Sequence, residues 1–184
     1  MTMPLRPPPA QYLRDDAIRG GMDLLFFARR SHLAHADAEL AARGLGRAHH
    51  RLLYFVGRYS DLSVSDLLKI LGVTKQSLGR VMKDLIERGL IVARPGTQDR
   101  RRRLLALTPE GQKLEANLFD DLKRNMARAY HEAGETAVTG YWILMQHLMN
   151  GEARDQFSRL RAAMRTRVSD QADGSSSLVR QGSP

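Results

Sequence analysis

The fold is decided by residues 63–108, whose sequence is SVSDLLKILGVTKQSLGRVMKDLIERGLIVARPGTQDRRRRLLALT. Its first four residues form a capping-box pattern, in which the Ser63 hydroxyl accepts a hydrogen bond from the backbone of Asp66 and the Asp66 carboxylate reaches back. A helix is therefore expected to begin at Val64. Gly72 is expected to end it, because glycine readily adopts the left-handed conformation that often follows a helix C-cap.

A second helix is predicted directly after this turn. Thr74 can cap its N-terminus, residues 75–88 repeat apolar positions at helical spacing, and Gly89 ends it. Its apolar face consists of Leu78, Val81, Met82, Leu85 and Ile86. Two short helices joined by a turn that contains glycine predict a helix-turn-helix.

A β-hairpin is predicted after the second helix. Residues 90–93 and 104–107 are apolar runs of strand length, and a Pro-Gly turn signal lies between them. The chain returns to helix at Thr108, an N-cap residue that precedes a proline at the first helical position. The pattern predicts a helix-turn-helix followed by a wing.

Long helices are expected on both sides of this lobe. Apolar residues recur at steps of three and four over residues 15–42, a shorter helix is expected over 47–59, and further helices are expected over 109–133 and 136–167 with a break at Gly134. The predicted fold class is mainly α with a small β-hairpin, a winged helix-turn-helix with long N- and C-terminal dimerisation helices. The expected segments are a disordered tail over 1–12, a dimerisation helix within 13–46, the DNA-binding lobe over 47–108, C-terminal dimerisation helices over 109–167 and a disordered tail over 168–184.

The charge of the chain favours a polyanionic partner. The formal net charge is +9 in 184 residues, which suits either nucleic acid or an acidic membrane surface. Residues 74–103 hold nine Lys or Arg and three acids, so the second helix and the hairpin carry six of the nine surplus charges. A surplus on these two elements indicates double-stranded DNA as the partner.

Side chains for DNA contact are predicted on both elements. Gln76, Arg80 and Lys83 share the helix face opposite the apolar stripe, and in a major groove arginine can pair with guanine and glutamine with adenine. Gly79 is interpreted as allowing close approach to DNA or to a neighbouring helix. Arginines at the hairpin tip suit a minor groove, where the potential is most negative. The predicted DNA-binding residues are Thr74, Lys75, Gln76, Ser77, Arg80, Lys83, Asp99, Arg100, Arg101 and Arg102.

With these residues in view, the sequence resembles a known family, the MarR-type (multiple-antibiotic-resistance) transcriptional regulators. Asp99, Arg101 and the pair Leu107 and Thr108 match the wing signature of that family. Residues 71–96 resemble its recognition helix and first wing strand. The resemblance is therefore carried by the helix and the wing that hold the positive charge.

The resemblance covers the order of elements over residues 15–150 and is specific over residues 62–111. It implies a triangular homodimer with interlocked N- and C-terminal helices, which binds a palindromic operator as a sequence-specific regulator. It also implies that Asp99 orients the hairpin and that Arg101 enters the minor groove. Three further arginines beside Arg101 leave open which of them enters deepest.

The resemblance further implies a small-molecule effector, an aromatic or amphipathic acid, in the crevice between the dimer helices and the lobe. The candidate residues are Phe26, Arg29, Arg30, His32, His35, Arg51 and Tyr54. In the alternative interpretation, Phe26 and Tyr54 are core residues and the arginines contact DNA phosphates or acidic side chains.

Other function classes have less support. No enzyme activity and no cofactor are expected, because the sequence lacks a phosphate-binding glycine loop and a nucleophile elbow. No metal site is expected, although His32 and His35 lie one turn apart and leave a metal-responsive regulator of the same fold as an alternative. A non-specific architectural DNA-binding protein is a second alternative. It would not explain why Gln76 and Arg80 share one face.

The cellular setting is predicted from what the sequence lacks. It has no cysteine, which excludes disulfides, thiolate metal sites and thiol-based sensing. Its first residues lack the apolar segment of a signal peptide, and it has no run of about 18 apolar residues. We therefore expect a cytoplasmic protein that has no membrane partner.

Overall fold

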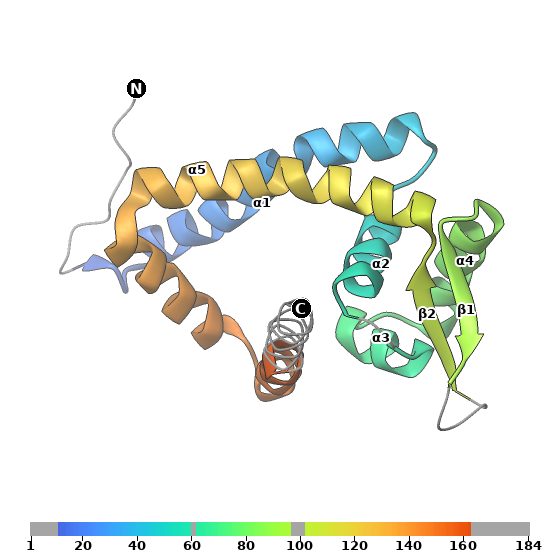
Figure 1. Cartoon of the computed structure of the whole chain (residues 1–184). Coiled ribbons are helices and arrows are strands. Elements are labelled where there is room, and N and C mark those ends of the chain that lie inside the picture. The colour runs from blue at the N-terminus through green and yellow to red at the C-terminus, as the bar shows by residue number, and fades with distance from the viewer. Residues whose placement is uncertain (1–10, 60–61, 97–101, 163–184) are drawn as a thin grey trace, which may run out of the picture.

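The computed structural model describes residues 11–59, 62–96 and 102–162 of the chain. Helices α1 and α5 lie side by side, and the shorter elements form a lobe at one end of this pair (Figure 1). The predicted fold class is confirmed. In chain order the elements are α1 (Asp15–Ala42), α2 (Arg47–Arg58), α3 (Val64–Leu71), α4 (Lys75–Glu87), β1 (Ile91–Pro95), β2 (Arg103–Leu107) and α5 (Pro109–Leu148), followed by a helical stretch over 151–162.

The helix-turn-helix is formed by α3 and α4 and begins with the predicted caps. The backbone N–H of Ser63 donates to Asp66 Oδ2 at 3.0 Å, and Ser63 Oγ accepts from the backbone N–H of Asp66 at 3.2 Å. Gly72 ends α3 in the left-handed conformation, with φ +60°. Thr74 Oγ1 accepts from the backbone N–H of Ser77 at 3.2 Å and caps α4. Both helices therefore start at the predicted residues.

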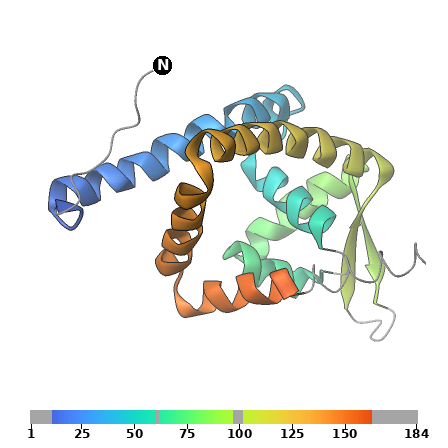
Figure 2. The same cartoon turned by 60° about the vertical axis from the view of Figure 1, so that its left-hand side comes forward.

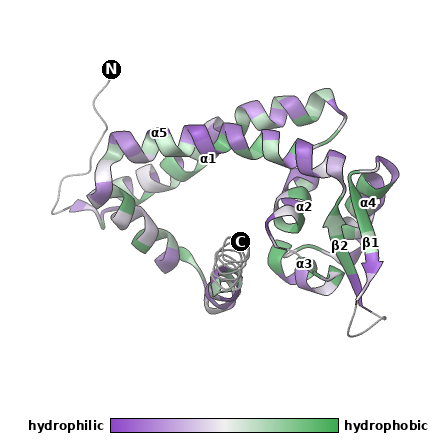
Figure 3. Cartoon of the chain, in the orientation of Figure 1, coloured by the Kyte–Doolittle hydropathy of each residue, from purple (hydrophilic) through white to green (hydrophobic). Residues whose placement is uncertain are grey.

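The wing is an antiparallel pair of strands. Its register runs from Ile91 opposite Leu107 to Pro95 opposite Arg103. The backbone N–H of Leu105 also donates to the carbonyl of Leu62 at 3.1 Å, so the segment before α3 joins the edge of β2. In Figure 3 both strands are apolar near the start of α5 and polar toward the tip. The hairpin thus has its apolar end in the lobe and its polar end outside it.

One apolar core connects the lobe to α1 and α5. Ile86, which the spacing placed in the apolar face of α4, is instead 40% exposed. Ile86 is rotated by about 100° around the helix axis from its buried neighbour Leu85, which places it at the edge of the buried face. The fully or nearly buried apolar residues are Ala36, Leu40, Leu45, Leu52, Leu53, Val56, Leu62, Leu67, Leu78, Leu85, Ile91, Leu105, Leu114 and Leu118.

Helix α1 is covered at its C-terminal end only. Ala36 and Leu40 are buried, whereas Ile18, Met22 and Leu25 of the same predicted stripe are exposed. Figure 2 shows the N-terminal part of α1 extending away from the rest of the chain. Large apolar side chains that are exposed on α1 and α5 are Ile18, Met22, Leu24, Leu25, Phe26, Phe27, Phe119, Tyr141, Trp142, Ile143, Leu144 and Leu148.

Helix α5 bends at the predicted glycine. Gly134 has φ +79°, a value outside the helical range, and the chain turns there before it continues as helix (Figure 1). A second break follows Leu148, where Asn150 Oδ1 accepts from the backbone N–H of Ala153 at 2.8 Å and caps residues 151–162. The predicted disordered tails lie outside the described residues, apart from positions 11 and 12.

In the part of the chain that the structure describes, no helix is both long enough and apolar enough to cross a membrane.

Candidate DNA interface and adjoining cavities

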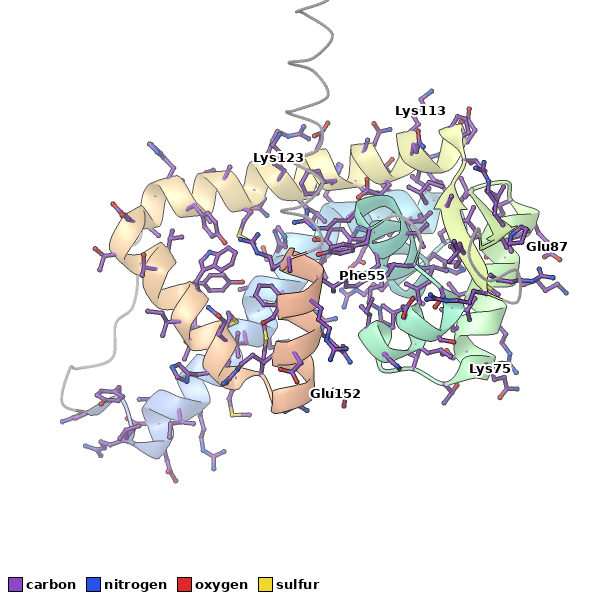
Figure 4. All side chains as sticks on the ribbon, turned by 60° about the horizontal axis from the view of Figure 1, so that its bottom comes forward. Phe55, Lys75, Glu87, Lys113, Lys123 and Glu152 are labelled. Atoms are coloured by element: carbon purple, nitrogen blue, oxygen red, sulfur yellow. The ribbon has the colours of Figure 1, made fainter. Side chains whose placement is uncertain are left out.

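Helix α4 has one buried face and one exposed basic face. Leu78 and Leu85 are almost completely buried against the core. Lys75 lies at the opposite end of α4 from Glu87 (Figure 4). Lys83 lies 3.6 Å from Glu87, a contact between two well-exposed side chains that contributes little to stability. The six α4 residues and cap residues predicted to bind DNA are all exposed: Thr74, Lys75, Gln76, Ser77, Arg80 and Lys83.

The N-terminus of α4 is suited to an anion. Thr74 and Ser77 lie there, and the helix dipole and the first backbone N–H groups favour negative charge at this end. Gln76 and Arg80 follow on the exposed side at a spacing of one turn. The arrangement thus offers phosphate-binding groups at one end of a surface that can contact bases.

Gly79 faces open space on α4. A Cβ built on it meets no heavy atom within 4 Å. The interpretation that Gly79 allows close approach of a neighbouring helix is therefore wrong within the described chain, because the adjacent elements contact α4 from its other side. Close approach to DNA stays a prediction.

The wing residues divide into two groups. Asp99, Arg100 and Arg101 lie outside the described residues. Arg102 is described, and its Nη2 lies 3.2 Å from Asp66 Oδ2 at the start of α3. The carbonyl of Arg102 also accepts from the backbone N–H of Gly96 at 2.8 Å, which extends the strand pairing by one position beyond Pro95 and Arg103, on the tip side of the hairpin. This ion pair was not predicted from the sequence, although Asp66 was identified as a capping residue.

Asp66 is a strongly bonded carboxylate. Partial burial raises its pKa, but hydrogen bonds from the hydroxyl and backbone of Ser63 and the charges of Arg102 and Lys69 outweigh burial and lower the pKa below its usual value. Its Oδ2 lies 2.6 Å from Ser63 Oγ, so one oxygen serves both the cap of α3 and the wing. The carboxylate therefore stays ionised and couples the helix-turn-helix to the hairpin.

Comparisons with known proteins agree with this geometry. Residues 43–102 match the model of the MarR family. The chain is 40% identical over 152 residues to the HTH-type transcriptional regulator PetP of Rhodobacter capsulatus, and the match covers 83% of this chain and 92% of that relative. The chain belongs to the MarR family of transcriptional regulators. The resemblance inferred from the recognition helix and wing is thus confirmed, and this MarR-family protein is a DNA-binding transcriptional regulator.

Several solved structures share its fold. A SlyA-like regulator from Listeria monocytogenes matches with a TM-score of 0.60 at 19% identity, over 74% of this chain and 90% of that one. MepR of S. aureus, in a complex with DNA, matches with a TM-score of 0.55 at 20% identity, over 69% of this chain and 97% of that one. At these identities the matches establish the common architecture.

A cavity of about 620 Å³ lies between α1, α2 and α5 of this MarR-family protein. Four of the seven predicted effector residues line it, namely Arg29, His32, Arg51 and Tyr54. The contribution of α5 was not predicted from the sequence, because periodicity identifies an apolar face but not the element opposite it. The remaining lining residues are Leu33, Arg47, His50, Arg58, Phe119, Leu122, Lys123, Met126, Ala127 and Tyr130.

The other three predicted effector residues lie outside this lining. Phe26 is 62% exposed, so the alternative that it is a core residue is wrong for the single chain. The guanidinium of Arg30 lies over the rings of Phe26 and Phe27, 5.9 and 5.2 Å from their centroids. His35 Nδ1 lies 3.2 Å from Asp121 Oδ2. Phe26 and Arg30 thus contact one another on α1, and His35 contacts α5.

The wall of the large cavity combines positive charge with aromatic and aliphatic surface. Among the described residues that line it there is no carboxylate. Burial lowers the pKa of His50, with Asp37 opposing this effect, and burial raises the pKa of Tyr54. His50 and Tyr54 are therefore uncharged near neutral pH, and the arginines and Lys123 carry the charge, of which that of Arg47 is already paired with Asp37. Such a wall suits a ligand with an apolar body and an anionic group.

A smaller cavity of about 280 Å³ lies beside the ends of α1 and α4. Its two arginines are already bonded within the chain. Arg88 Nε lies 2.7 Å from Asp84 Oδ1, and Arg43 Nη2 lies 3.3 Å from Glu39 Oε1. Lys113 and Glu110 also line this cavity, so the lysine that could attract an anion is accompanied by a carboxylate that repels one.

The alternative of a metal-responsive regulator has no support from the described residues. They contain no group of three or more His, Cys, Asp or Glu side chains that could hold a metal ion.

Proposed function

We propose that this regulator binds a palindromic operator as a homodimer, with α4 of each protomer in a major groove and the wing in the adjacent minor groove. The observation that carries the proposal is the continuous exposed face of α4, on which Gln76, Arg80 and Lys83 lie opposite a buried apolar face. Palindromic sites match the two-fold symmetry of a dimer whose recognition helices enter grooves about one helical turn apart.

The residues of α4 have distinct proposed roles. Arg80 pairs with guanine through two hydrogen bonds, and Gln76 pairs with a neighbouring adenine. Thr74, Lys75, Ser77 and Lys83 contact phosphates, which position the helix without reading sequence.

The wing roles come from the family resemblance. Arg101 enters the minor groove, Arg100 contacts the adjacent phosphates, and Asp99 maintains the shape of the hairpin. Arg102 differs from its neighbours in this proposal, because its ion pair with Asp66 assigns it to holding the wing against α3.

The homodimer is proposed because α1 and α5 carry apolar surface that this chain does not cover. Ile18, Met22, Leu25 and Trp142 are examples on the two helices, and a surface of this extent is typical of an interface. Light scattering at micromolar concentration is expected to give the mass of a dimer. Truncation after residue 150 is expected to weaken assembly, and a monomeric full-length chain would contradict the proposal.

The proposed effector is an amphipathic aromatic acid in the 620 Å³ cavity, where Arg29 and Arg51 face the carboxylate and Tyr54 faces the ring. A panel of aromatic carboxylates is titrated while the fluorescence of Trp142, the single tryptophan, and DNA release are followed. Binding that Arg51→Ala weakens supports the proposal. Equal binding of every compound by wild type and by Arg51→Ala would contradict this location of the effector site.

The operator is tested by in vitro selection of random duplexes with the purified protein. We expect selected sequences to share an inverted repeat. Retention of fragments without any common motif, with equal affinity for all duplexes at one salt concentration, would instead support the architectural alternative.

A further inference from the structure

Three elements are joined by a chain of hydrogen bonds where the lobe meets α1. We propose that His49 and Arg88 are positioning residues, which contact no DNA but hold α4 at a fixed orientation to α1 and so set the distance between the two recognition helices of the dimer. The inference rests on the homodimer proposed above. It assigns a role in operator spacing to side chains grouped around the C-terminal turn of α4, one turn beyond Arg80.

The centre of the arrangement is Asp84 in the last turn of α4. Its Oδ2 lies 2.9 Å from His49 Nε2, and its Oδ1 lies 2.7 Å from Arg88 Nε. The hydrogen bond from Arg88 and its charge, with a smaller contribution from His49, outweigh the effect of burial and lower the pKa of Asp84. One ionised carboxylate therefore accepts from two side chains, and charge-assisted hydrogen bonds are the stronger kind.

Arg88 and His49 also form hydrogen bonds to the four-residue connector between α1 and α2, residues 43–46. Arg88 Nη1 donates to the carbonyl of Arg43, the first residue of the connector, at 2.9 Å. The backbone N–H of Gly46, its last residue, donates to His49 Nδ1 at 3.0 Å. The end of α4 is thus fastened to both ends of the connector through which the lobe is attached to α1.

This attachment bears on DNA binding through geometry. Asp84 follows Lys83 directly, so a change in the contacts of Asp84 moves the exposed face of α4 relative to α1. In the proposed dimer, α1 contributes to the interface, and each α4 must reach a half-site about one helical turn from the other. A looser connector would allow the two α4 helices of the dimer to adopt several separations. The preference of the dimer for one spacing between half-sites would then weaken.

His49 allows a test without a change of formal charge, because its two nitrogens have different partners. His49 Nδ1 accepts from Gly46 and Nε2 donates to Asp84, as the hydrogen-bond partners require. His49→Asn keeps an acceptor near the Nδ1 position and loses the donor toward Asp84. His49→Gln keeps a donor near the Nε2 position. The two variants therefore separate the cap of α2 from the link to α4.

The experiment uses the full-length chain at pH 8 and the palindrome selected in vitro. Affinities are measured for this duplex, for duplexes whose centre is longer or shorter by one or two base pairs, and for a duplex that holds one half-site. We expect His49→Asn to weaken binding to the selected palindrome by roughly 3- to 10-fold, which corresponds to the net contribution of one ordinary hydrogen bond. We expect its affinities for the altered spacings to approach that for the selected one, and the half-site affinity to stay within about twofold of wild type.

His49→Gln is expected to keep the wild-type spacing preference. The inference would be overturned if His49→Asn kept that preference, if it weakened half-site and palindrome equally, or if His49→Gln behaved like His49→Asn. A wild-type protein without any spacing preference would instead overturn the proposed homodimer on a palindrome. The two failures are thus distinguishable.

Discussion

Arg102 Nη2 lies 3.2 Å from Asp66 Oδ2, and this contact ties the tip-side end of the wing strands to the first turn of α3. The same carboxylate accepts from the hydroxyl and the backbone N–H of Ser63, at 2.6 and 3.0 Å. Asp66 therefore holds together the start of the helix-turn-helix and the hairpin. Arg102 belongs to the basic run of the wing, but its ion pair stabilises the position of the hairpin. In our proposal Arg101 provides the DNA contact.

Acid is expected to destabilise the lobe through Asp66. Its pKa is lower in the folded chain than its usual value, so its stabilising contribution is complete above the unfolded pKa of about 3.9 and is lost as the pH falls through the folded value. Urea unfolding between pH 7 and pH 3 is expected to show a shallower dependence on pH for Asp66→Asn than for wild type below about pH 4. Identical profiles would show that Asp66 has no such role.

Arg80→Ala is expected to relax base preference at one position of each half-site by about 1–3 kcal/mol, because the two hydrogen bonds to guanine are removed. Gln76→Ala is expected to act in the same way at a neighbouring A·T pair. The measurement is in vitro selection repeated with each variant. A selected motif that is the same as for wild type would mean that α4 is seated differently in the groove.

Arg101→Ala is expected to weaken specific and non-specific binding by similar factors, because a minor-groove arginine responds to potential and width more than to base identity. The slope of log affinity against log salt should become shallower by about 0.9 for each phosphate charge that is no longer neutralised. Affinities for the operator and for random DNA over a salt series measure both effects. The melting temperature should stay close to that of wild type.

Asp99→Ala is the comparison variant for the wing. It raises the local positive charge, yet we expect lower affinity because Asp99 is proposed to maintain the hairpin. Tighter binding by Asp99→Ala together with a harmless Arg101→Ala would show that the wing acts as a simple cluster of charge.

Gly79 and Gly111 provide a matched pair of glycine-to-alanine substitutions in helices. A Cβ on Gly79 meets nothing within 4 Å, so Gly79→Ala is expected to stabilise the fold by about 0.5–1 kcal/mol and to weaken DNA binding if α4 approaches the groove closely. A Cβ on Gly111 would lie 1.9 Å from the carbonyl oxygen of Leu90, so Gly111→Ala is expected to cost about 1–3 kcal/mol. Chemical denaturation and DNA titration of both variants are the measurements. Unchanged operator affinity of Gly79→Ala would remove the close-approach interpretation.

Local signals in the sequence were sufficient to predict the order of elements and several of their ends. The capping box at Ser63, the Thr74 cap and the break at Gly134 involve residues within three or four positions of one another, or a single backbone conformation. The basic face of α4 also follows from helical spacing alone. Interactions of this kind do not depend on which distant segment packs nearby, so they can be inferred from the chain directly.

The tertiary structure decided which residues from different elements meet. Arg102 contacts Asp66 across 36 positions, and His49 contacts Asp84 from another helix. The large cavity combines residues of α1 and α2 with Phe119, Lys123 and Tyr130 of α5, while Phe26, Arg30 and His35 lie outside its lining. Periodicity fixes the direction of a side chain around its own helix, but the packing of helices fixes what lies opposite, and that depends on the whole core.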